Sequence, residues 1–577
     1  MNREVVMKKY KTLDGYHVYG IKKDKKRIFL ADRINYGKEI KKLLDTLDDL
    51  KFDSLIFLFG IDTGAYIPLM KKLLCERNRV IIFEPNPGIR KKFGSKLGDN
   101  IILVPFDENQ VKQIFDSMIH FKNINNIYFH AFGNYRSVYE EEYGRLIELL
   151  DWTIINAASQ VDLAKRFKKV FIQNMIANMK ALDRSTPIHR CRLSNLNVPA
   201  LVVSGGPSLD SNIKDMLAHK DQLDRYFIIT GSRTVEALTK NGIVPDMIVS
   251  VDPVDANFDM MKNCLNLEAP LAFYEYSNRY LVRDYKGDKV FISLLFSQTV
   301  EGFENYQAVF CGGSVAHACI DIANMTGCSP IIFLGQDFAH TYHKHHADSA
   351  VFDYDKSLTY GATTLVKDVY GNPVGTTVTL DHYRRRLEHY ITIFKDQKRI
   401  RFINCSYGAE IKGAPHKELS EVFKEEATGR QKKKFIPSRE VHMDSKETID
   451  SLLHFLEEYR IKASQCLELC EIIRSENHTK SLLKIDERDI DLQRILYILK
   501  VVTDFENDVN TKYLGGYFSE FVFEMKEKTF HMSAKDYKKL TSDLQHQARS
   551  FQIYFNRMKE MLEEVNETIL ETVTEFY

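Results

Sequence analysis

The chain has 577 residues, of which 44% are hydrophobic and 28% charged, and its formal net charge is +1 at pH 7. This length predicts about three domains of roughly 100–200 residues each. The near-neutral charge gives no electrostatic reason to expect a nucleic-acid partner. No signal peptide and no run of roughly 18 apolar residues is seen, so we expect a cytoplasmic protein without a membrane span. Nine cysteines without a C-x-x-C pair favour free thiols over disulfides or a zinc site.

Residues 1–160 are predicted to form a Rossmann-like α/β domain. Apolar runs at Ser54–Phe59 and Val80–Phe83 are separated by a helical pattern through Ile67, Met70 and Leu74. The turn from Gly60 to Gly64, with Glu84 after the second run, resembles a degenerate nucleotide-binding turn that lacks its third glycine. Such a turn also serves tight packing between a strand and a helix, and we favour that alternative over ligand binding.

Residues 161–425 are predicted to form a central α/β domain with a mainly parallel, doubly wound sheet. It begins with a helical passage from Val161 to Leu182, in which Asn174 and Asn178 share a helix face. Apolar runs then recur with helical segments between most of them, as in a sheet covered on both faces. The predicted strands are Leu201–Val203, Phe227–Thr230, Met247–Val251, Leu271–Tyr274, Val290–Ile292, Ala308–Phe310, Ile331–Leu334 and Arg401–Ile403.

Glycines and polar residues follow five of these runs, where ligands of parallel sheets bind. Glycine lets the backbone approach a ligand, and the first N–H groups of the following helix attract a phosphate. A strand–turn–helix with glycine is also common in α/β proteins, and Ser208 could simply cap its helix. The candidate donor or nucleotide site is formed by Gly205, Gly206, Pro207, Ser208, Gly231, Ser232, Asp252, Gly312, Gly313 and Ser314.

Residues 440–577 are predicted to form an all-α domain. Proline is absent after Pro437, Asp444 with Glu447 makes a capping signature, and an apolar helical pattern starts at Ile449. The apolar stripes are typical of a helical bundle core.

The central motifs resemble those of the motility-associated factor family, bacterial flagellin glycosyltransferases. The resemblance rests on Gly-Gly-Pro-Ser-Leu (205–209), Gly-Ile-Val-Pro-Asp (242–246) leading to Ser-Val-Asp-Pro (250–253), Gly-Gly-Ser-Val-Ala (312–316), Leu-Gly-Gln-Asp-Phe-Ala (334–339) and Asn-Cys-Ser-Tyr-Gly-Ala-Glu (404–410). The same motifs are similar to those of bacterial sialyltransferases and of an archaeal 6-hydroxymethylpterin diphosphokinase. The family resemblance implies transfer of a nonulosonic acid, pseudaminic or legionaminic acid, from its CMP-activated form to Ser or Thr of flagellin during flagellum assembly.

That chemistry requires donors on a phosphate that gains charge and a base for the acceptor hydroxyl. Asp252 and Asp337 follow predicted strands and are candidates for holding the ribose, a sugar hydroxyl or a divalent cation such as Mg²⁺ or Mn²⁺. Either aspartate could instead cap a turn or end its strand. The sequence assigns no other cofactor and leaves the metal site unknown.

Two histidines are candidates for catalysis beside Asp337. His345 belongs to a histidine-rich loop after Asp337, where distant sialyltransferases carry a tyrosine. A solvated loop is the alternative, and we prefer it for His343 and His346. His382 precedes the last predicted strand by the interval at which those relatives place a basic histidine, although a surface histidine fits the same spacing.

We therefore expect a CMP-nonulosonate-dependent protein O-glycosyltransferase with flagellin as its acceptor. The alternatives are a pterin diphosphokinase and a non-catalytic flagellin adaptor that binds a nucleotide sugar. The oligomeric state and the identity of the sugar are left open.

Overall fold

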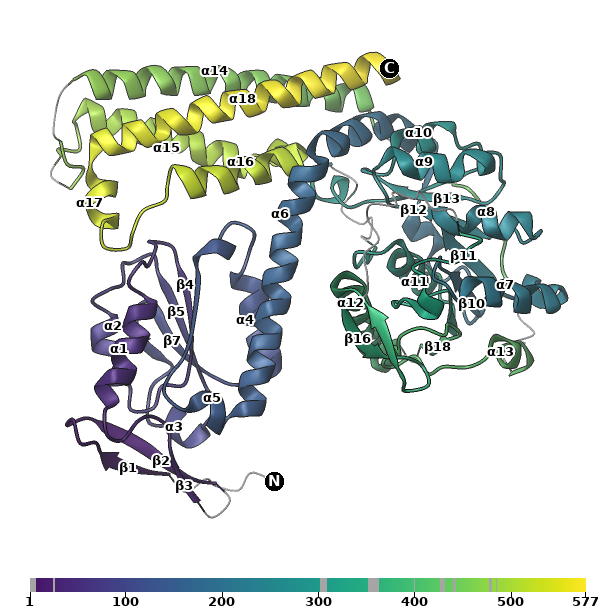
Figure 1. The fold of residues 1–577 in the computed structure, drawn as a ribbon. Coiled ribbons are helices and arrows are strands. Elements are labelled where there is room, and N and C mark those ends of the chain that lie inside the picture. The colour runs from purple at the N-terminus through teal and green to yellow at the C-terminus, as the bar shows by residue number, and fades with distance from the viewer. Residues whose placement is uncertain are drawn as a thin grey trace. The chain divides into compact units, whose positions relative to one another are not determined.

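The computed structural model describes residues 7–23, 26–300, 303, 309–350, 363–398, 400–425, 431–438, 443–476, 480–483 and 485–577. The chain forms two compact units, each assembled from segments distant in the sequence (Figure 1). The first comprises Met1–Lys168, Leu456–Thr511 and Gly515–Glu564, and the second comprises Lys169–Phe455, Lys512–Leu514 and Val565–Tyr577. Within the described part of the chain, no helix is both long and apolar enough to cross a membrane.

The second unit is built on an eight-stranded sheet in the order β18-β15-β10-β11-β12-β13-β14-β9. Every neighbouring pair in this sheet is parallel. This confirms the predicted parallel sheet. The strands are β9 (Ser185–Pro187), β10 (Ala200–Val203), β11 (Phe227–Gly231), β12 (Met247–Ser250), β13 (Leu271–Tyr274), β14 (Lys289–Ile292), β15 (Ile331–Leu334) and β18 (Phe402–Asn404).

Helices cover both faces of this sheet, which explains why its strands are continuous apolar runs. On β10, Val202 belongs to the core on one face, whereas Leu201 and Val203 belong to the core on the other. A hairpin of β16 (Thr364–Lys367) and β17 (Pro373–Thr376) lies between β15 and α12 in the chain. The helices are α7 (Leu209–Ala218), α8 (Ser232–Lys240), α9 (Asp255–Met261), α10 (Arg279–Asp284), α11 (Val315–Met325), α12 (Val378–Lys398) and α13 (Leu419–Glu425).

The strand order reverses between β10 and β15. From β10 the chain proceeds through β11 to β14 on one side, and then returns to form β15 on the other side of β10. The loops that follow β10 and β15 therefore diverge at the carboxyl edge and leave a crevice between them.

One predicted strand of this unit is wrong. Val309 and Phe310 are irregular, while Ala308 lies outside the described residues. The N–H of Phe310 donates to the carboxylate of Asp321 on α11 at 2.9 Å, so this apolar segment is held by a helix side chain.

The two asparagines predicted to share a helix face do so on α6 (Glu140–Leu182). The Asn174 side chain donates to the carbonyls of Pro253 and Tyr276, both at 2.9 Å, and Asn178 donates to those of Glu275 and Ser277. These bonds attach α6 to the segments that follow β12 and β13.

The first unit contains a five-stranded sheet in the order β6-β7-β5-β4-β8, with β6 antiparallel and the other pairs parallel. Helix α1 lies on one side of the sheet, and α4 lies on the other (Figure 1). This confirms the predicted N-terminal α/β fold. The elements are β4 (Leu55–Phe59), β5 (Arg79–Glu84), β6 (Lys96–Gly98), β7 (Ile101–Pro105), β8 (Ile127–Ala131), α1 (Tyr36–Thr46), α2 (Ile67–Met70), α3 (Pro87–Arg90), α4 (Glu108–Met118) and α5 (Tyr135–Val138).

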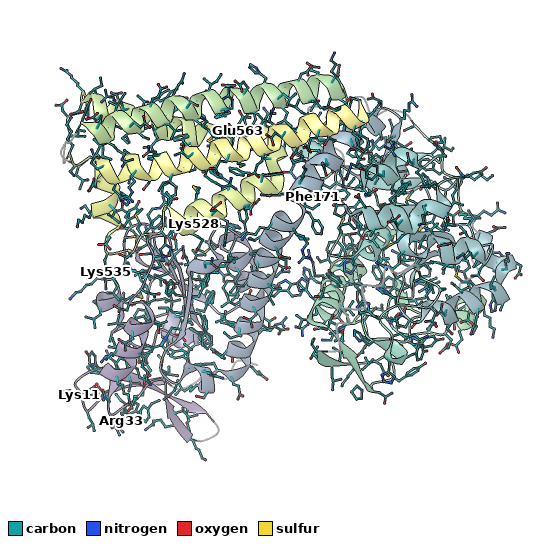
Figure 2. All side chains as sticks on the ribbon, turned by 45° about the horizontal axis from the view of Figure 1, so that its top comes forward. Lys11, Arg33, Phe171, Lys528, Lys535 and Glu563 are labelled. Carbon is teal, nitrogen blue, oxygen red and sulfur yellow. The ribbon has the colours of Figure 1, made fainter. Side chains whose placement is uncertain are left out.

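Two local features of this unit differ from the sequence prediction. Helix α2 ends at Met70, before Leu74, because the N–H groups of Lys72 and Leu73 bond three residues back rather than four. A small antiparallel sheet of β1 (Met7–Lys11), β2 (His17–Lys23) and β3 (Lys26–Phe29) precedes the α/β part. Beside it, the Arg33 guanidinium lies 5.3 Å from the centre of the Phe29 ring (Figure 2).

The helical part contains α14 (Ser445–Ser475), α15 (Ile490–Asn507), α16 (Gly515–Lys528), α17 (Tyr537–Ser542) and α18 (Leu544–Phe576). Aromatic contacts join its helices, with ring centres 5.0 Å apart for Tyr459–Phe505 and 4.9 Å for Phe521–Tyr554. Charged residues such as Lys528, which bonds Glu524 at 2.6 Å, lie outside this core (Figure 2). The predicted cap is also present, since Asp444 accepts the N–H of Glu447.

The turn at Gly60 is filled by the protein's own side chains. A Cβ on Gly60, whose φ is +97°, would lie 2.3 Å from the Tyr135 ring. One oxygen of Glu84 accepts the Tyr135 hydroxyl and the N–H of Ile61, and the other accepts the N–H of Asn86. Of the two alternatives, this geometry supports packing rather than ligand binding.

We predict that the first unit loses stability as the pH rises from 5 to 8. Burial raises the pKa of Glu84 to about 7 and that of Asp62 to about 6. A carboxyl group whose pKa is higher in the folded state stabilises that state below its unfolded pKa, and this contribution disappears as the pH rises through the folded value. For Glu84 the loss is about 3 kcal/mol. Hydrogen exchange of the β4 and β5 amides measures it.

Glu84→Gln is the matched control, because an amide does not ionise in this range. The variant is less stable overall but shows a flatter decline between pH 5 and 8. Identical pH dependence in the variant and the wild type would contradict the assignment to Glu84.

Candidate functional site

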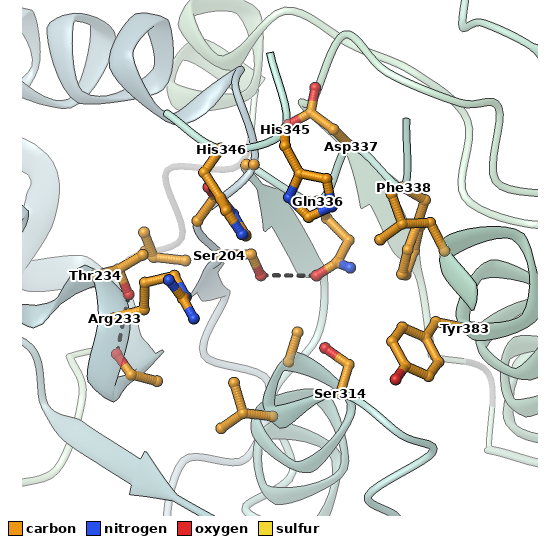
Figure 3. A pocket seen from close by; sticks show the side chains of 18 of the residues that line it. Ser204, Arg233, Thr234, Ser314, Gln336, Asp337, Phe338, His345, His346 and Tyr383 are labelled. Atoms are coloured by element: carbon orange, nitrogen blue, oxygen red, sulfur yellow. Dashed lines mark hydrogen bonds between the residues drawn. The ribbon is translucent and has the colours of Figure 1, made fainter. Parts of the chain in front are cut away.

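A cavity of about 260 Å³ lies at the carboxyl edge of the eight-stranded sheet, at the reversal of strand order (Figure 3). Its walls come from the ends of β10, β11 and β15, the first turns of α8 and α11, the loop after β15, and α12. The residues that line it are Val203, Ser204, Gly205, Gly206, Gly231, Arg233, Thr234, Ser314, Val315, Ala316, Gly335, Gln336, Asp337, Phe338, Ala339, His345, His346, Leu380 and Tyr383.

Two helix N-termini contribute to the lining. Arg233 and Thr234 lie in the first turn of α8, while Ser314 is the N-cap of α11. The first N–H groups of a helix have no partner within it and carry the positive end of the helix dipole. The cavity wall therefore favours an anionic group.

Arg233 adds a full positive charge to this wall. Its guanidinium points into the cavity (Figure 3), and its Cδ packs over Gly205, where a Cβ would lie 3.1 Å away. Burial raises the pKa of Asp252, and the charge of Arg233 opposes that rise. Asp252 is exposed and does not line the cavity, but it lies near enough to Arg233 for the two charges to interact.

Gln336 and Asp337 are adjacent, yet their side chains point in different directions. Gln336 faces the cavity and accepts a hydrogen bond from the Ser204 hydroxyl at 2.7 Å (Figure 3). The carboxylate of Asp337 is directed away, where it accepts both the N–H of Ser208, at 3.0 Å, and the Ser208 hydroxyl. Burial raises the pKa of Asp337, and its bonds with Ser208 oppose that rise.

The Gly-Gly-Pro-Ser turn offers fewer free amides than its sequence indicates. The N–H of Gly206 donates to the carbonyl of Gly335 at 2.8 Å, and that of Ser208 donates to Asp337. Pro207 has no N–H. Gly205 and Gly206 line the cavity, whereas Pro207 and Ser208 hold the turn in place.

Of the remaining predicted donor residues, some line the cavity and others lie outside it. Gly231 and Ser314 line the cavity, whereas Ser232, Gly312 and Gly313 do not. The two glycines make room for the aromatic rings packed against them. A Cβ on Gly312 would lie 2.1 Å from His317 Nδ1, and one on Gly313 would lie 2.4 Å from the Tyr383 ring.

The histidine-rich loop places His345 and His346 at the cavity. Burial, with the nearby Arg233 charge, lowers the pKa of His346 to about 4. Burial also lowers the pKa of His345, and His340 and Arg233 add to that effect. Both imidazoles are therefore neutral at pH 7.

His382 stands outside the lining, although its neighbour Tyr383 is part of it. The sequence prediction also omitted Arg233, Gln336, Ser204 and Tyr383 from the site. Arg233 carried a usable signal, since it is a basic residue directly after Gly231 and Ser232 at the end of a predicted strand. Tyr383 carried none, because it reaches the cavity from a helix distant in the sequence.

No group of three or more His, Cys, Asp or Glu side chains in the described ranges is arranged to hold a metal ion. The candidate site is thus a cationic, glycine-lined cavity with two neutral histidines.

Comparisons with known proteins relate this cavity to a known fold. The structure aligns with a MAf glycosyltransferase from Magnetospirillum magneticum AMB-1 over 100% of this chain and 96% of that one, with a TM-score of 0.57 and 13% identity. The chain has the fold of that glycosyltransferase. Residues 173–343 match the family described as 6-hydroxymethylpterin diphosphokinase MptE-like. Of the resemblances predicted from the sequence, the one to motility-associated factor glycosyltransferases is confirmed in the fold, and the one to a pterin diphosphokinase is confirmed in this segment.

A curated protein with a similar sequence does not indicate a function. It is an uncharacterized protein of Treponema pallidum (strain Nichols), 22% identical over 146 residues. The match covers 25% of this chain and 64% of that protein.

We predict that Gly206→Ala destabilises the second unit, whereas Gly205→Ala is tolerated. A Cβ on Gly206 would lie 2.3 Å from Asp337 Oδ2 and 2.5 Å from the carbonyl oxygen of Gly335, while one on Gly205 meets only the flexible Arg233 side chain within 3.4 Å. Overpacking of this kind costs about 1–3 kcal/mol. Chemical denaturation of both variants measures the difference in the free energy of unfolding. Equal values would contradict the prediction, because the turn would then accommodate the extra Cβ without loss of stability.

Proposed function

We propose that the chain is a glycosyltransferase that moves a nonulosonic acid, such as pseudaminic or legionaminic acid, from its CMP-activated donor to Ser or Thr hydroxyls of flagellin. The observation that carries the proposal is the cavity at the sheet's reversal point, where Arg233 and two helix N-termini converge in a fold shared with a MAf glycosyltransferase. The full-length fold match supports the reaction class. The sequence motifs support the donor and the acceptor.

The cavity residues suit the departure of CMP. The bond between the anomeric carbon and the phosphate oxygen breaks, and its electron pair leaves with CMP. Arg233 and the first turns of α8 and α11 stabilise the negative charge that gathers on this phosphate. Ser204 and Gln336, held by their mutual hydrogen bond, present polar groups to the sugar or the nucleoside.

The acceptor oxygen forms the new bond to the anomeric carbon, and its proton passes to a ring nitrogen of His345. A base must be unprotonated at working pH, which the lowered pKa of His345 satisfies. We prefer His345 to His382 because only His345 lines the cavity. In this scheme Asp337 is a positioning residue that acts through Ser208, and Asp252 binds a donor hydroxyl or a divalent cation at the cavity edge.

A second candidate is a pterin diphosphokinase, since the match over residues 173–343 includes Arg233, Ser314 and Asp337. The same cationic wall would then hold the phosphates of ATP. Production of a pterin diphosphate from ATP and 6-hydroxymethylpterin, with no sugar transfer, would favour this candidate.

The test is incubation of the full chain with its host's flagellin and CMP-pseudaminic or CMP-legionaminic acid, with and without Mg²⁺, followed by intact-mass spectrometry of flagellin. A mass gain of one or more nonulosonic acid residues supports the proposal. CMP binding without any mass gain favours a non-catalytic adaptor, and absence of CMP binding overturns the donor site.

We predict that Arg233→Ala weakens CMP binding about tenfold to a hundredfold, because a hydrogen bond to a charged group contributes ~1.5–3 kcal/mol. Arg233→Lys keeps the charge and recovers part of the affinity, although it loses the planar fork. Calorimetry measures both. The exposed Arg283→Ala, whose guanidinium pairs with Asp284 outside the cavity, is the matched control. An unchanged affinity in Arg233→Ala would remove this residue from the site.

We also predict that the transfer rate falls at low pH with an inflection below 6.5, the ordinary pKa of histidine. Neutral His345 is the active form, and its pKa is lowered, so activity is complete above the inflection and is lost below it. Rates measured from pH 5 to 8 test this. His345→Gln, which cannot take up the proton, should have low activity without that inflection, and an inflection that persists there belongs to another group.

A further inference from the structure

A second, larger cavity adjoins the first along the loop that follows β15. Its volume is about 710 Å³, and it lies between this loop, the β16–β17 hairpin and Tyr407, which follows β18. The same loop lines the first cavity through Asp337–Ala339 and His345–His346, and the second through His340–His343. A molecule in the second cavity therefore lies beside a donor held in the first.

Fixed aromatic rings form much of its wall. The Tyr407 hydroxyl donates to Glu418 at 2.6 Å, and the His416 ring lies between Tyr407 and Tyr370, with ring centres 5.5 and 5.6 Å away. Tyr370 and Tyr342 are 62% and 60% exposed. The φ of Tyr342 is +55°, in the left-handed region that side chains other than glycine seldom adopt. Such strain often accompanies a binding function.

Several polar groups of this wall already have partners. The carboxylate of Asp368 accepts the N–H groups of Tyr370 and Asn372, at 2.9 and 2.8 Å. The Tyr407 hydroxyl is bonded to Glu418, and the N–H of His340 donates to the carbonyl of Gly375. Two lining groups, His340 Nε2 and Thr341 Oγ1, are buried without a hydrogen-bond partner among the described residues.

The residue types of the wall indicate which kind of molecule the cavity binds. The described residues that line the cavity include no lysine or arginine, so an anionic sugar or phosphate finds no counter-charge. A neutral sugar needs a partner for each hydroxyl group, whereas the Asp368 and Tyr407 oxygens are already engaged by the protein. An apolar side chain matches the aromatic faces, and the peptide group beside it can bond His340 Nε2.

We propose that the second cavity binds an apolar side chain of the acceptor polypeptide, next to the Ser or Thr that receives the sugar. The inference rests on the proposed function, since the first cavity must hold the donor. It adds a sequence preference for the acceptor: a large apolar residue close to the modified hydroxyl.

The test is binding of short fluorescein-labelled peptides to the full chain, followed by fluorescence anisotropy in the presence of CMP. Each peptide has a central Ser or Thr and either Phe, Leu or Ala at one flanking position. We expect Phe or Leu at a preferred position to bind at least tenfold more tightly than Ala, which is ~1.4 kcal/mol.

Variants of Tyr370 separate ring contact from hydrogen bonding. Tyr370→Ala should weaken binding of the Phe or Leu peptide about tenfold, and Tyr370→Phe should not, because the ring supplies the contact. Val374→Trp should also weaken it by filling the cavity. Leu365→Ala is the matched control, since Leu365 is 70% exposed on the same hairpin but does not line the cavity. Exposure of Tyr370 makes its truncation compatible with folding, which a thermal melt verifies.

Equal binding of all peptides, or an unchanged affinity in both Tyr370→Ala and Val374→Trp, overturns the inference. So does saturation transfer from the protein to a methyl glycoside that is lost in Tyr370→Ala, with no peptide effect, because the cavity would then be a sugar site. Failure of the proposed function is seen separately, as absent CMP binding or absent transfer while the peptide preference persists.

Discussion

The buried contact between Asp337 and Ser208 holds the candidate site together. Asp337 is 2% exposed, and its carboxylate accepts both the N–H and the hydroxyl of Ser208. The Ser208 oxygen in turn accepts the N–H of Tyr407 at 2.8 Å. Three loops, which follow β10, β15 and β18, are thus tied together at the edge of the sheet. Gly408 allows two of these loops to approach closely, since a Cβ at this position would lie 2.3 Å from the Asp337 carbonyl oxygen.

This junction explains why the sequence pointed to the loops that line the cavity but not to the direction of each side chain in them. Glycine-rich strand ends predict a ligand edge in any parallel sheet, and the cavity lies there. An acidic residue at such an edge suggests chemistry, yet the carboxylate of Asp337 is used within the protein, and its neighbour Gln336 faces the cavity. The direction of a side chain in a loop depends on partners distant in the sequence, here Ser208, and no local pattern contains that information. For the same reason Tyr383, which comes from α12, escaped the prediction.

The fold was more predictable than the site because buried parallel strands must be apolar on both faces. β10, β11, β13 and β15 stand out as apolar runs for this reason. β9, with the sequence Ser-Thr-Pro, and the lysine-rich β1 to β3 lack the pattern and were missed. The predicted boundary at residue 160 falls inside α6, where an uninterrupted helical pattern carries the chain from one compact unit into the next.

The two cavities differ in charge, although one loop lines both. Arg233 and helix N-termini make the first suitable for a phosphate, while aromatic rings and occupied polar groups make the second unsuitable for an anion. In the proposed reaction this asymmetry separates an anionic donor from an acceptor that does not compete for the cationic wall. Between them the loop carries histidines whose lowered pKa values keep them neutral. A neutral imidazole at that boundary does not repel Arg233, whereas the charge of Arg233 disfavours its protonated form. In the proposed reaction, the loop both separates the two substrates and supplies the base between them.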